Sequence, residues 1–491
     1  MGRLAIGWPC APPKDLPVQY VSTRDARPRP DRVEFADVLL RGLAPDGGLY
    51  VPNQWPSLSA SEWRGLRGRP YAEVAERLIA PFLGGFLAPA QLRQVIADSY
   101  AGFDDPRVVT LKELASGLWL LELFHGPTLA FKDYALQLVG RLFDAALSQR
   151  GGRVTIIGAT SGDTGSAAIE ATRDRATADI FMLYPEGRIS EVQRRQMTTV
   201  PSANVHALAV EGSFDDCQDL VKAMFADAPF RAAHNLSAVN SINWARIVAQ
   251  TVYYAYAALA LGAPDKKVSF AVPTGNFGNV YAAHVARLMG LPIGDLVIAT
   301  NRNDILARFF GGKGMTLRAV EPSLSPSMDI QVSSNFERLF FDLRRRDGNA
   351  VAAAMTQFRG AGTLPVSEAE LAEARGLFSA RTCDDNATLA EIERTWRERG
   401  VMLDPHSAVG VAAAKAHLAA GHDGPIVSLA TAHPAKFPDA IERAIGRRPD
   451  LPPRLAAAMT LPERLVRLPN KLKDVEDYIA AHARPIAEAA A

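Results

Sequence analysis

The segment "RVTIIGATSGDTGSAAIEATRD", residues 153–174, joins an apolar run rich in β-branched residues to a glycine-rich turn and a helical pattern. A continuous apolar run of this length is typical of a strand buried on both faces of a parallel sheet. The same order returns in "KVSFAVPTGNFGNVYAAHVARLMG", residues 267–290, and in "DLVIATNRNDILARFF", residues 295–310. The alternation predicts an α/β fold whose parallel sheets are covered by helices on both faces.

Three polar turns follow strands of this kind: "TSGDTG" at 160–165, "TGNFGN" at 274–279 and "TAHPAKF" at 431–437. Ligands of open α/β sheets gather at the carboxyl ends of the strands. We therefore expect the ligand site of the chain among these turns.

The turn at 274–279 has the features of a phosphate cup. Gly275 and Gly278 allow a ligand to approach the backbone closely, and the helix that follows offers unpaired N–H groups and the positive end of its dipole. The pattern is neither GxGxxG nor a Walker motif. On its own, the segment fits a phosphate cup and an ordinary strand-to-helix turn equally well.

A second turn of this type lies in "GATSGDTGSAA", residues 158–168. Ser161, Thr164 and the N–H groups beside the two glycines could hold a carboxylate or a phosphate. Asp163 is unusual there, because a carboxylate in an anion cup must either cap the helix or face a cationic or protonated group. Helix caps are common, so this segment alone slightly favours the cap.

Lys132 stands where the loop "HGPTLAF", residues 125–131, turns into the apolar helical pattern "KDYALQLVG". Most lysines of this type are surface residues. Packed apolar neighbours, however, disfavour the charged form, which lowers the pKa and frees the amine to form a Schiff base with a carbonyl compound such as pyridoxal phosphate. Thr431, at the end of the strand "IVSLA", could face the pyridine nitrogen of that cofactor.

The composition excludes several classes of function. The chain has 491 residues, enough for two or three domains, and a net charge of +1, so no global field favours nucleic acid or an anionic membrane. Cys10, Cys217 and Cys383 are far apart, which indicates a reducing, cytoplasmic location. The longest apolar run is too short to span a bilayer.

The sequence contains no motif of a metal site or of a serine hydrolase. His125, His406 and His433 lie beside Gly or Pro in polar turns without metal-ligand spacing, so we expect hydrogen-bonded residues and no metal site. Ser161 is not part of a GxSxG elbow.

Taken together, these segments resemble the threonine synthase family, pyridoxal-phosphate enzymes with the tryptophan-synthase-β fold, fold type II. The resemblance runs from Tyr20 to about Leu468. Within the family, the chain is most similar to the fungal and Gram-negative bacterial branch. One departure is Asp25 in "YVSTRD", where the family usually has glycine. The matching pieces are "YVSTRD", "LLRGLAPDGGLYVP", "HGPTLAFKD", "GATSGDTGSAA", "NSINWARI", "PTGNFGN", "PSMDIQVSSNFERLFF", "DPHSAVG" and "TAHPAKF".

The resemblance implies two open α/β domains and an N-terminal domain. We expect an extension at 1–19 and the N-terminal domain at 20–107. The smaller α/β domain, with the SGDTG loop, would cover 108–262, and the larger one, with the GNFGN cup, 263–470. A C-terminal helix or tail would cover 471–491.

The resemblance also implies roles for individual residues. Lys132 would be the catalytic residue and would hold pyridoxal 5'-phosphate through a Schiff base, and Thr431 would face the pyridine nitrogen. The cofactor phosphate would be bound by Gly275, Asn276, Phe277, Gly278 and Asn279. The ring hydroxyl and the substrate carboxylate would lie against Ser161, Asp163 and Thr164. Candidates for the substrate phosphate are Asn243, Arg246 and Lys436.

The implied reaction converts O-phospho-L-homoserine and water into L-threonine and phosphate, with the lysine amine as both base and acid. Two alternatives stay open: a phospholyase of the same family that stops at a keto acid, and a cofactor-binding protein without turnover. The expected partner is a small-molecule substrate, with no nucleic acid and no membrane, and the expected assembly is a monomer or a homodimer.

Overall fold

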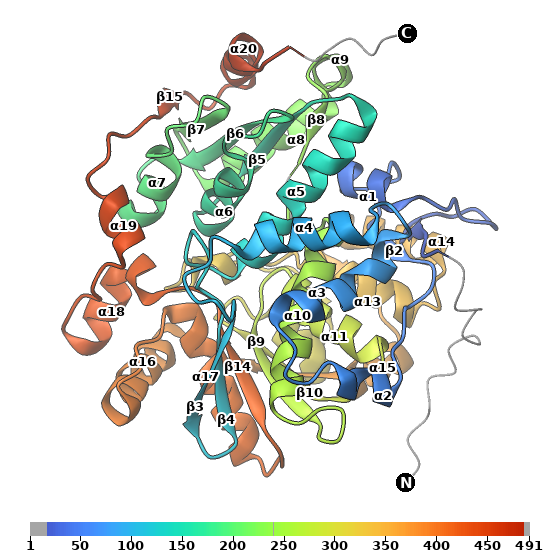
Figure 1. The fold of residues 1–491 in the computed structure, drawn as a ribbon, viewed down its shortest axis with the longest axis vertical. Coiled ribbons are helices and arrows are strands. Elements are labelled where there is room, and N and C mark those ends of the chain that lie inside the picture. Colours follow the sequence, from blue (N-terminus) through green and yellow to red (C-terminus); the bar gives the residue numbers. More distant parts are fainter. Residues whose placement is uncertain (1–16, 239, 486–491) are drawn as a thin grey trace.

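The computed structural model describes residues 17–238 and 240–485 and contains two α/β sheets (Figure 1). The larger sheet has the order β13 (Phe378–Thr382), β10 (Ile293–Thr300), β9 (Val268–Pro273), β14 (Ile426–Ala430), β4 (Leu118–Glu122) and β3 (Thr110–Ala115). The smaller sheet has the order β15 (Val466–Leu468), β7 (Val205–Val210), β6 (Ala178–Pro185), β5 (Val154–Ala159) and β8 (Leu236–Ser237). Every pairing is parallel except β3 with β4. The predicted α/β fold is confirmed.

Helices cover the sheets and form most of the N-terminal region. Two short antiparallel pairs complete the strands, β1 (Tyr20–Ser22) with β2 (Tyr50–Pro52) and β11 (Met315–Thr316) with β12 (Thr363–Leu364). The helices in chain order are α1 (Phe35–Arg41), α2 (Ala60–Gly65), α3 (Tyr71–Ile79), α4 (Pro89–Tyr100), α5 (Lys132–Arg150), α6 (Asp163–Thr172), α7 (Glu191–Thr198), α8 (Phe214–Ala226), α9 (Ala228–Ala233), α10 (Trp244–Ala260), α11 (Gly278–Leu288), α12 (Ile305–Arg308), α13 (Phe336–Leu343), α14 (Gly348–Ala361), α15 (Glu368–Leu377), α16 (Asp385–Arg399), α17 (Pro405–Ala419), α18 (Pro438–Ile445), α19 (Pro453–Ala458) and α20 (Leu472–His482).

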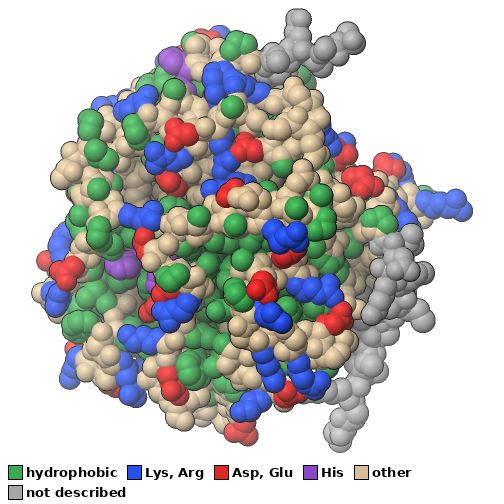
Figure 2. Space-filling model, in the orientation of Figure 1, with side chains coloured by type: hydrophobic (Ala, Val, Ile, Leu, Met, Phe, Trp, Pro, Cys, Tyr) green, Lys and Arg blue, Asp and Glu red, His purple; other side chains and the backbone are tan. Residues whose placement is uncertain are grey.

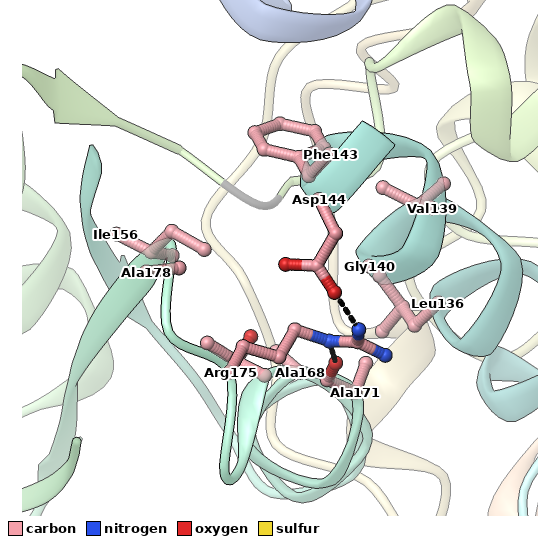
Figure 3. Close-up of a pocket in the computed structure, with 11 residues that line it drawn as sticks. Leu136, Val139, Gly140, Phe143, Asp144, Ile156, Ala168, Ala171, Arg175 and Ala178 are labelled. Atoms are coloured by element: carbon pink, nitrogen blue, oxygen red, sulfur yellow. Dashed lines mark hydrogen bonds and ion pairs between the residues drawn. The ribbon is translucent and has the colours of Figure 1, made fainter. Parts of the chain in front are cut away.

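Close packing fixes α5 against α6 (Figure 3). A Cβ atom at Gly140 would lie 2.5 Å from the carbonyl oxygen of Ala171, so only glycine allows this approach. Arg175 donates to the same carbonyl and pairs with Asp144 across the two helices. The contact therefore sets the relative positions of the two helices, which begin at Lys132 and Asp163.

The sheets do not follow two of the predicted domain boundaries. Strands β3 and β4, expected in the smaller domain, belong to the larger sheet, where β4 pairs with β14. Strand β15, expected in the larger domain, pairs with β7 of the smaller sheet. Parallel pairing joins segments hundreds of residues apart, and the local sequence pattern carries no sign of the partner.

The N-terminal region shares its core with the rest of the chain. Tyr20, Trp55 and Phe82 all contact the ring of Trp244 at the start of α10, with centroid distances between 5.9 and 6.0 Å. The blue N-terminal elements accordingly lie against α10 in Figure 1. This region therefore supports the beginning of α10 from one side.

Asp25 fits its turn without needing the glycine that is usual in the family. Its carboxylate accepts hydrogen bonds from Arg27, at 2.6 Å, and from the amide of Asp31, at 3.0 Å. The side chain thereby stabilises the turn in which it lies.

The two chain ends were predicted as an extension and a helical tail. Helix α20 is present within 471–491, and its buried Val475 and Ile479 pack against α8 and the smaller sheet. Residues 1–16 of the extension and residues 486–491 lie outside the described part of the chain. None of the described helices has the length and apolar character needed to cross a bilayer. On the face shown in Figure 2, positive and negative side chains are interspersed.

Candidate active site

Lys132 is the first residue of α5 and is only 7% exposed. Its Nζ lies 3.2 Å from Oδ2 of Asp163, the first residue of α6. The fully buried Lys436 approaches the other oxygen of the same carboxylate at 3.0 Å and donates to the carbonyl of Thr128 at 2.7 Å. The structure thus brings three of the predicted site residues together, with one carboxylate between two buried lysines.

Burial and charge act in opposite directions on this cluster. Burial lowers the pKa of Lys132, and the positive charges of Lys436 and Arg246 lower it further, against the opposing effect of Asp163. Burial alone would raise the pKa of Asp163, but the charges of Lys436 and Lys132 outweigh it and hold the pKa well below its usual range. Asp163 is therefore an anion beside an amine that loses its proton readily.

Asp163 does not cap α6, although the sequence of the loop alone favoured that role. Gly162 is the N-cap residue of α6, and Asp163 directs its carboxylate to the lysines instead. The hydroxyl of Thr160 accepts hydrogen bonds from the amides of Gly162, at 3.0 Å, and Gly165, at 2.8 Å, and so pairs the free N–H groups of this turn. Because another residue supplies the cap, the aspartate is free to face a cation.

A second buried carboxylate anchors the loop that leads into Lys132. Asp133 accepts hydrogen bonds from the amide and the hydroxyl of Thr128, at 2.8 and 2.6 Å. A Cβ atom at Gly126 would lie 2.5 Å from Cβ of Asp133, so the loop needs glycine there. Burial raises the pKa of the Asp133 carboxyl to about 6, although the bonds from Thr128 oppose this effect.

We expect Asp133→Asn to change how stability depends on pH. The folded pKa lies above the unfolded value of about 3.9, so the folded protein binds more protons between about pH 4 and 6. The contribution of Asp133 is therefore complete below about pH 4 and is lost as the pH rises to about 6. Asparagine resembles the protonated acid, so urea unfolding should show the advantage of wild type over the variant shrinking by up to about 3 kcal/mol across this interval. A difference that stays constant with pH would contradict the assignment.

The loop at 274–279 presents unpaired backbone amides. Within the described residues, the N–H groups of 275–280 have no hydrogen-bond acceptor. The carbonyls of Gly275 and Asn276 accept from Ser333, at 2.7 Å, and Asn335, at 3.1 Å, so the amides face the other side of the loop. Consecutive free amides at the start of a helix are an arrangement that is suited to binding an anion.

The shape of this cup depends on a special backbone and on a close neighbour. Phe277, the N-cap of α11, has a positive φ of 63°. A Cβ atom at Gly275 would lie 3.0 Å from the carbonyl oxygen of Ser327. The amide of Ser327 in turn donates to Nε2 of His406, whose Nδ1 is 2.9 Å from Asp404. The cup is therefore backed by a fixed turn.

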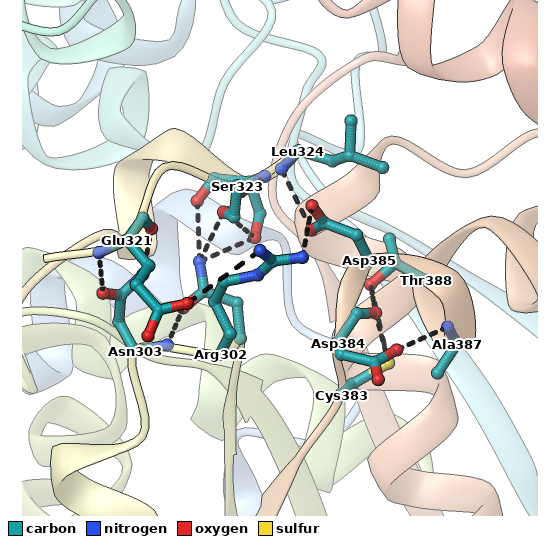
Figure 4. A network of polar contacts seen from close by, with 12 residues as sticks. Arg302, Asn303, Glu321, Ser323, Leu324, Cys383, Asp384, Asp385, Ala387 and Thr388 are labelled. Atoms are coloured by element: carbon teal, nitrogen blue, oxygen red, sulfur yellow. Dashed lines mark hydrogen bonds and ion pairs between the residues drawn. The ribbon is translucent and has the colours of Figure 1, made fainter.

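A polar network joins the residues after β10 to the segment at 321–324 and to the start of α16 (Figure 4). The carboxylate of Asp329 accepts hydrogen bonds from Ser323, at 2.6 Å, and from Asn303, at 3.0 Å. These bonds join the segment around Ser327 to the loop that follows β10. Arg302 and Asp385, the first residue of α16, add an ion pair at 2.9 Å. These bonds connect the segment behind the cup to β10 and α16.

Two buried side chains near these loops have donor atoms without a partner among the described residues. Arg246, in the first turn of α10, leaves Nε and Nη1 buried and unpaired, and burial lowers its pKa to about 10. Asn279, in the first turn of α11, leaves Nδ2 buried and unpaired. Unpaired buried donors are costly, so both groups indicate an absent acceptor such as an anion.

Thr431 lies directly beside Lys132. Its carbonyl accepts from the amide of Phe131 at 2.8 Å, and its own amide donates to the hydroxyl of Ser407 at 3.0 Å. The residue is 5% exposed, and its hydroxyl makes no hydrogen bond within the described part of the chain. The hydroxyl is therefore not engaged by its own turn.

The remaining predicted residues divide into two groups. Asn243 is engaged by the protein itself, because Oδ1 caps α10 at the amide of Ala245 and Nδ2 donates to the carbonyl of Leu39. Ser161 and Thr164 are half-buried at the beginning of α6. Their position beside Asp163 leaves them available to a ligand.

Sequence reasoning missed Gln193, which donates to Asp163 at 2.9 Å from α7. It also missed Thr128 and Asp133, which fix the loop before Lys132. Gln193 stands in an ordinary amphipathic helix and gives no signal of its own. Asp133, a charged residue at the start of an apolar helix, could have been recognised as a buried carboxylate.

The three histidines singled out in the sequence are hydrogen-bonded, as predicted, to Thr110 for His125, Asp404 for His406 and Ala435 for His433. A different group, Asp295 with His417 and His422, brings three possible metal ligands together. Both rings reach the same carboxylate oxygen, at 3.3 and 3.2 Å, but they stack 3.9 Å apart and only 18° from parallel. The contacts of both rings with this oxygen account for the group, so we assign no metal to it.

Comparison with known proteins explains the arrangement. Family models match residues 19–100 as "Threonine synthase N terminus", 106–432 as "Pyridoxal-phosphate dependent enzyme" and 407–479 as "Threonine synthase, C-terminal". The threonine synthase of Pseudomonas aeruginosa is 51% identical, with 95% of this chain and 98% of the relative covered. The chain belongs to the threonine synthase family. The predicted resemblance and the predicted cofactor, pyridoxal phosphate, are thereby confirmed.

Solved structures of the threonine synthase family agree with this fold. The pyridoxal-phosphate-bound threonine synthase of Brucella melitensis is 50% identical, with a TM-score of 0.91 and coverage of 95% of this chain and 100% of the other. The yeast threonine synthase is 38% identical, with a TM-score of 0.90 and coverage of 96% and 99%. The predicted fold, with an N-terminal domain ahead of the cofactor-binding sheets, is therefore that of the family.

Proposed function

We propose that this chain is a threonine synthase that converts O-phospho-L-homoserine and water into L-threonine and phosphate. The observation that carries the proposal is the buried Lys132, which lies beside Asp163 and Thr431 in a chain of this family. A protein that only bound the cofactor would not need a buried amine of lowered pKa. The proposed location is the cytoplasm, consistent with the buried free thiols of Cys217 and Cys383, and the proposed assembly is a monomer or a homodimer.

The residues present fit pyridoxal phosphate. The free amides of 275–280 and the unpaired Nδ2 of Asn279 supply donors for its phosphate, and a larger residue at Gly275 would disturb the cup. Lys132 would hold its aldehyde and Thr431 would face its pyridine nitrogen. When bound, the cofactor supplies an aldehyde for the substrate amine and a ring that withdraws electrons from the substrate carbons.

The protein's own groups supply the remaining chemistry. Lys132 Nζ, released from the cofactor by the substrate amine, would accept the proton from Cα and pass it to an oxygen of the substrate phosphate, which restores its lone pair. The amine would then accept a proton from Cβ and return it to Cγ, and the phosphate would return the other proton to Cα. Asp163 orients this amine through the contact at 3.2 Å. We assign the leaving phosphate to the unpaired guanidinium of Arg246, and the substrate carboxylate to Ser161 and Thr164 at the start of α6. Water adds at Cβ after phosphate has left Cγ.

Lys436 and Asn243 have more restricted parts in this proposal. Lys436 is committed to Asp163 and to the carbonyl of Thr128, so we propose that it balances the charge of Asp163 while Lys132 changes its state. Asn243 caps α10 and thereby directs the first turn, where Arg246 lies.

The test is an assay of the product formed from O-phospho-L-homoserine by the purified protein. Threonine and inorganic phosphate should appear in equal amounts. Phosphate together with a keto acid and ammonia would identify a phospholyase instead. Binding of the cofactor without any release of phosphate would reduce the protein to a binding function.

We expect Thr431→Val to weaken cofactor binding by about 0.5–1.5 kcal/mol and to slow turnover. Valine keeps the shape of threonine and removes the hydroxyl, while the covalent link to Lys132 should still form. Equilibrium titration with pyridoxal phosphate and the absorbance of the bound cofactor measure the two effects. Wild-type affinity and rate, together with a lower stability, would mean that Thr431 has only a structural role.

A further inference from the structure

The side chain of Asn279 is held by two tyrosine hydroxyls. Tyr253 and Tyr254, adjacent in α10, approach its Oδ1 at 2.5 and 2.7 Å, and all three residues are buried. Distances this short are typical of O–H···O bonds, whereas N–H···O bonds cluster near 2.9–3.0 Å. In this arrangement the oxygen of the amide faces the tyrosines.

The nitrogen of the same amide is the unpaired buried Nδ2 at the anion cup. We propose that Tyr253 and Tyr254 are positioning residues for the cofactor phosphate: by occupying Oδ1, they hold the Asn279 amide with its NH2 group toward the phosphate. This inference rests on the proposed cofactor site. It adds two residues from a different helix to a loop that otherwise binds through its own backbone.

The two hydroxyls act as a pair. Oδ1 has two lone pairs, and each tyrosine supplies one proton, so both lone pairs are used. Tyr253 also lies 3.1 Å from Oε1 of Gln250, but its single proton goes to the nearer Asn279. Rotating the amide by 180° would let the NH2 group donate to the tyrosine oxygens, but it would leave the proton of Tyr254 without an acceptor among the described residues and turn an oxygen lone pair toward an anion.

The tyrosines keep their protons under all working conditions. Burial raises the pKa of Tyr253 and of Tyr254 well above the usual value, and for Tyr253 the neighbouring Tyr254 adds to this effect. The hydroxyls are therefore permanent donors toward Oδ1. Their effect on the amide does not depend on pH in the range where the protein is folded.

The chain offers a matched control for a hydroxyl deletion. Tyr281 lies two residues after Asn279 in the same helix and is also buried, but its hydroxyl has no partner among the described residues. Tyr281→Phe removes the same atom from the same region without touching the amide. Phenylalanine keeps the ring packing in each case, such as the edge contact of Tyr254 with Phe270 at 5.0 Å.

The experiment compares pyridoxal phosphate with pyridoxal, which lacks the phosphate, by equilibrium titration of the full-length chain freed of cofactor. We expect Tyr253→Phe with Tyr254→Phe to weaken pyridoxal phosphate about tenfold, or about 1.4 kcal/mol, and to leave pyridoxal unchanged. Asn279→Ala should show the same selectivity, and Tyr281→Phe should bind both ligands as wild type does. If the double variant unfolds, the two single variants carry the test, each with a smaller selective loss.

Three results would overturn the proposal. The tyrosine variants could bind pyridoxal phosphate as tightly as wild type, or lose both ligands equally, which indicates general damage. Asn279→Ala could keep full affinity, in which case the positioned group is irrelevant. None of these outcomes affects the proposed reaction, because formation of threonine by the wild-type protein is measured separately.

Discussion

Lys132→Ala should abolish the covalent attachment of pyridoxal phosphate and reduce turnover by about 10³-fold or more. The variant removes the amine that holds the aldehyde and also the group that moves protons at Cα, Cβ and Cγ. Borohydride treatment of the wild-type protein should fix the cofactor to the peptide that contains Lys132, and the variant should show no such peptide. The cup at 274–279 is untouched, so the variant should still bind the cofactor non-covalently.

The stability of Lys132→Ala separates a chemical role from a structural one. Removing a buried lysine leaves Asp163 with Lys436 and Gln193, which still satisfy its carboxylate. We therefore expect circular dichroism and the unfolding midpoint to change little while the rate collapses. A variant that turns over O-phospho-L-homoserine at the wild-type rate would end the assignment of Lys132.

Local patterns in the sequence were sufficient for the strand-turn-helix units and for the two loops. Apolar runs predicted β5, β9 and β10, and the glycines at 162, 165, 275 and 278 marked the turns at their ends. Lys132 was recognisable because a lysine at the start of an apolar helix has few structural reasons to be there. These features depend on residues that are close together in the chain, so they can be recognised from a single sequence.

Contacts between distant segments could not be predicted in this way. The pairing of β4 with β14, and of β15 with β7, depends on which strands meet in space. The same holds for Asp163, since its three partners come from three different elements. A resemblance to a family can supply such partners, but the pattern of residues around Asp163 favoured a helix cap.

Arg246→Met should lower kcat/KM for O-phospho-L-homoserine by about 10²-fold or more without destabilising the protein. Arg246 is 4% exposed, and its Nε and Nη1 are unpaired within the described residues. Two lost charge-assisted hydrogen bonds to the substrate phosphate correspond to roughly 1.5–3 kcal/mol each. Since the free protein holds this charge without a partner, replacing it with an apolar group of similar length should leave the unfolding midpoint unchanged or raise it.

Arg287 is a partnered arginine for comparison. It is half-buried and its Nε has no partner among the described residues, but its two terminal nitrogens donate to the carbonyl of Leu377 at the end of α15, at 3.1 Å, and to that of Gly294 in β10, at 2.5 Å. These two bonds join α11 to both elements. Arg287→Met should therefore lower stability and leave KM unchanged. Inhibition by free phosphate gives an independent measurement, because it should weaken in Arg246→Met and persist in Arg287→Met. If Arg246→Met keeps wild-type kinetics and wild-type inhibition by phosphate, then the substrate phosphate is held elsewhere, and the unpaired guanidinium needs another anion.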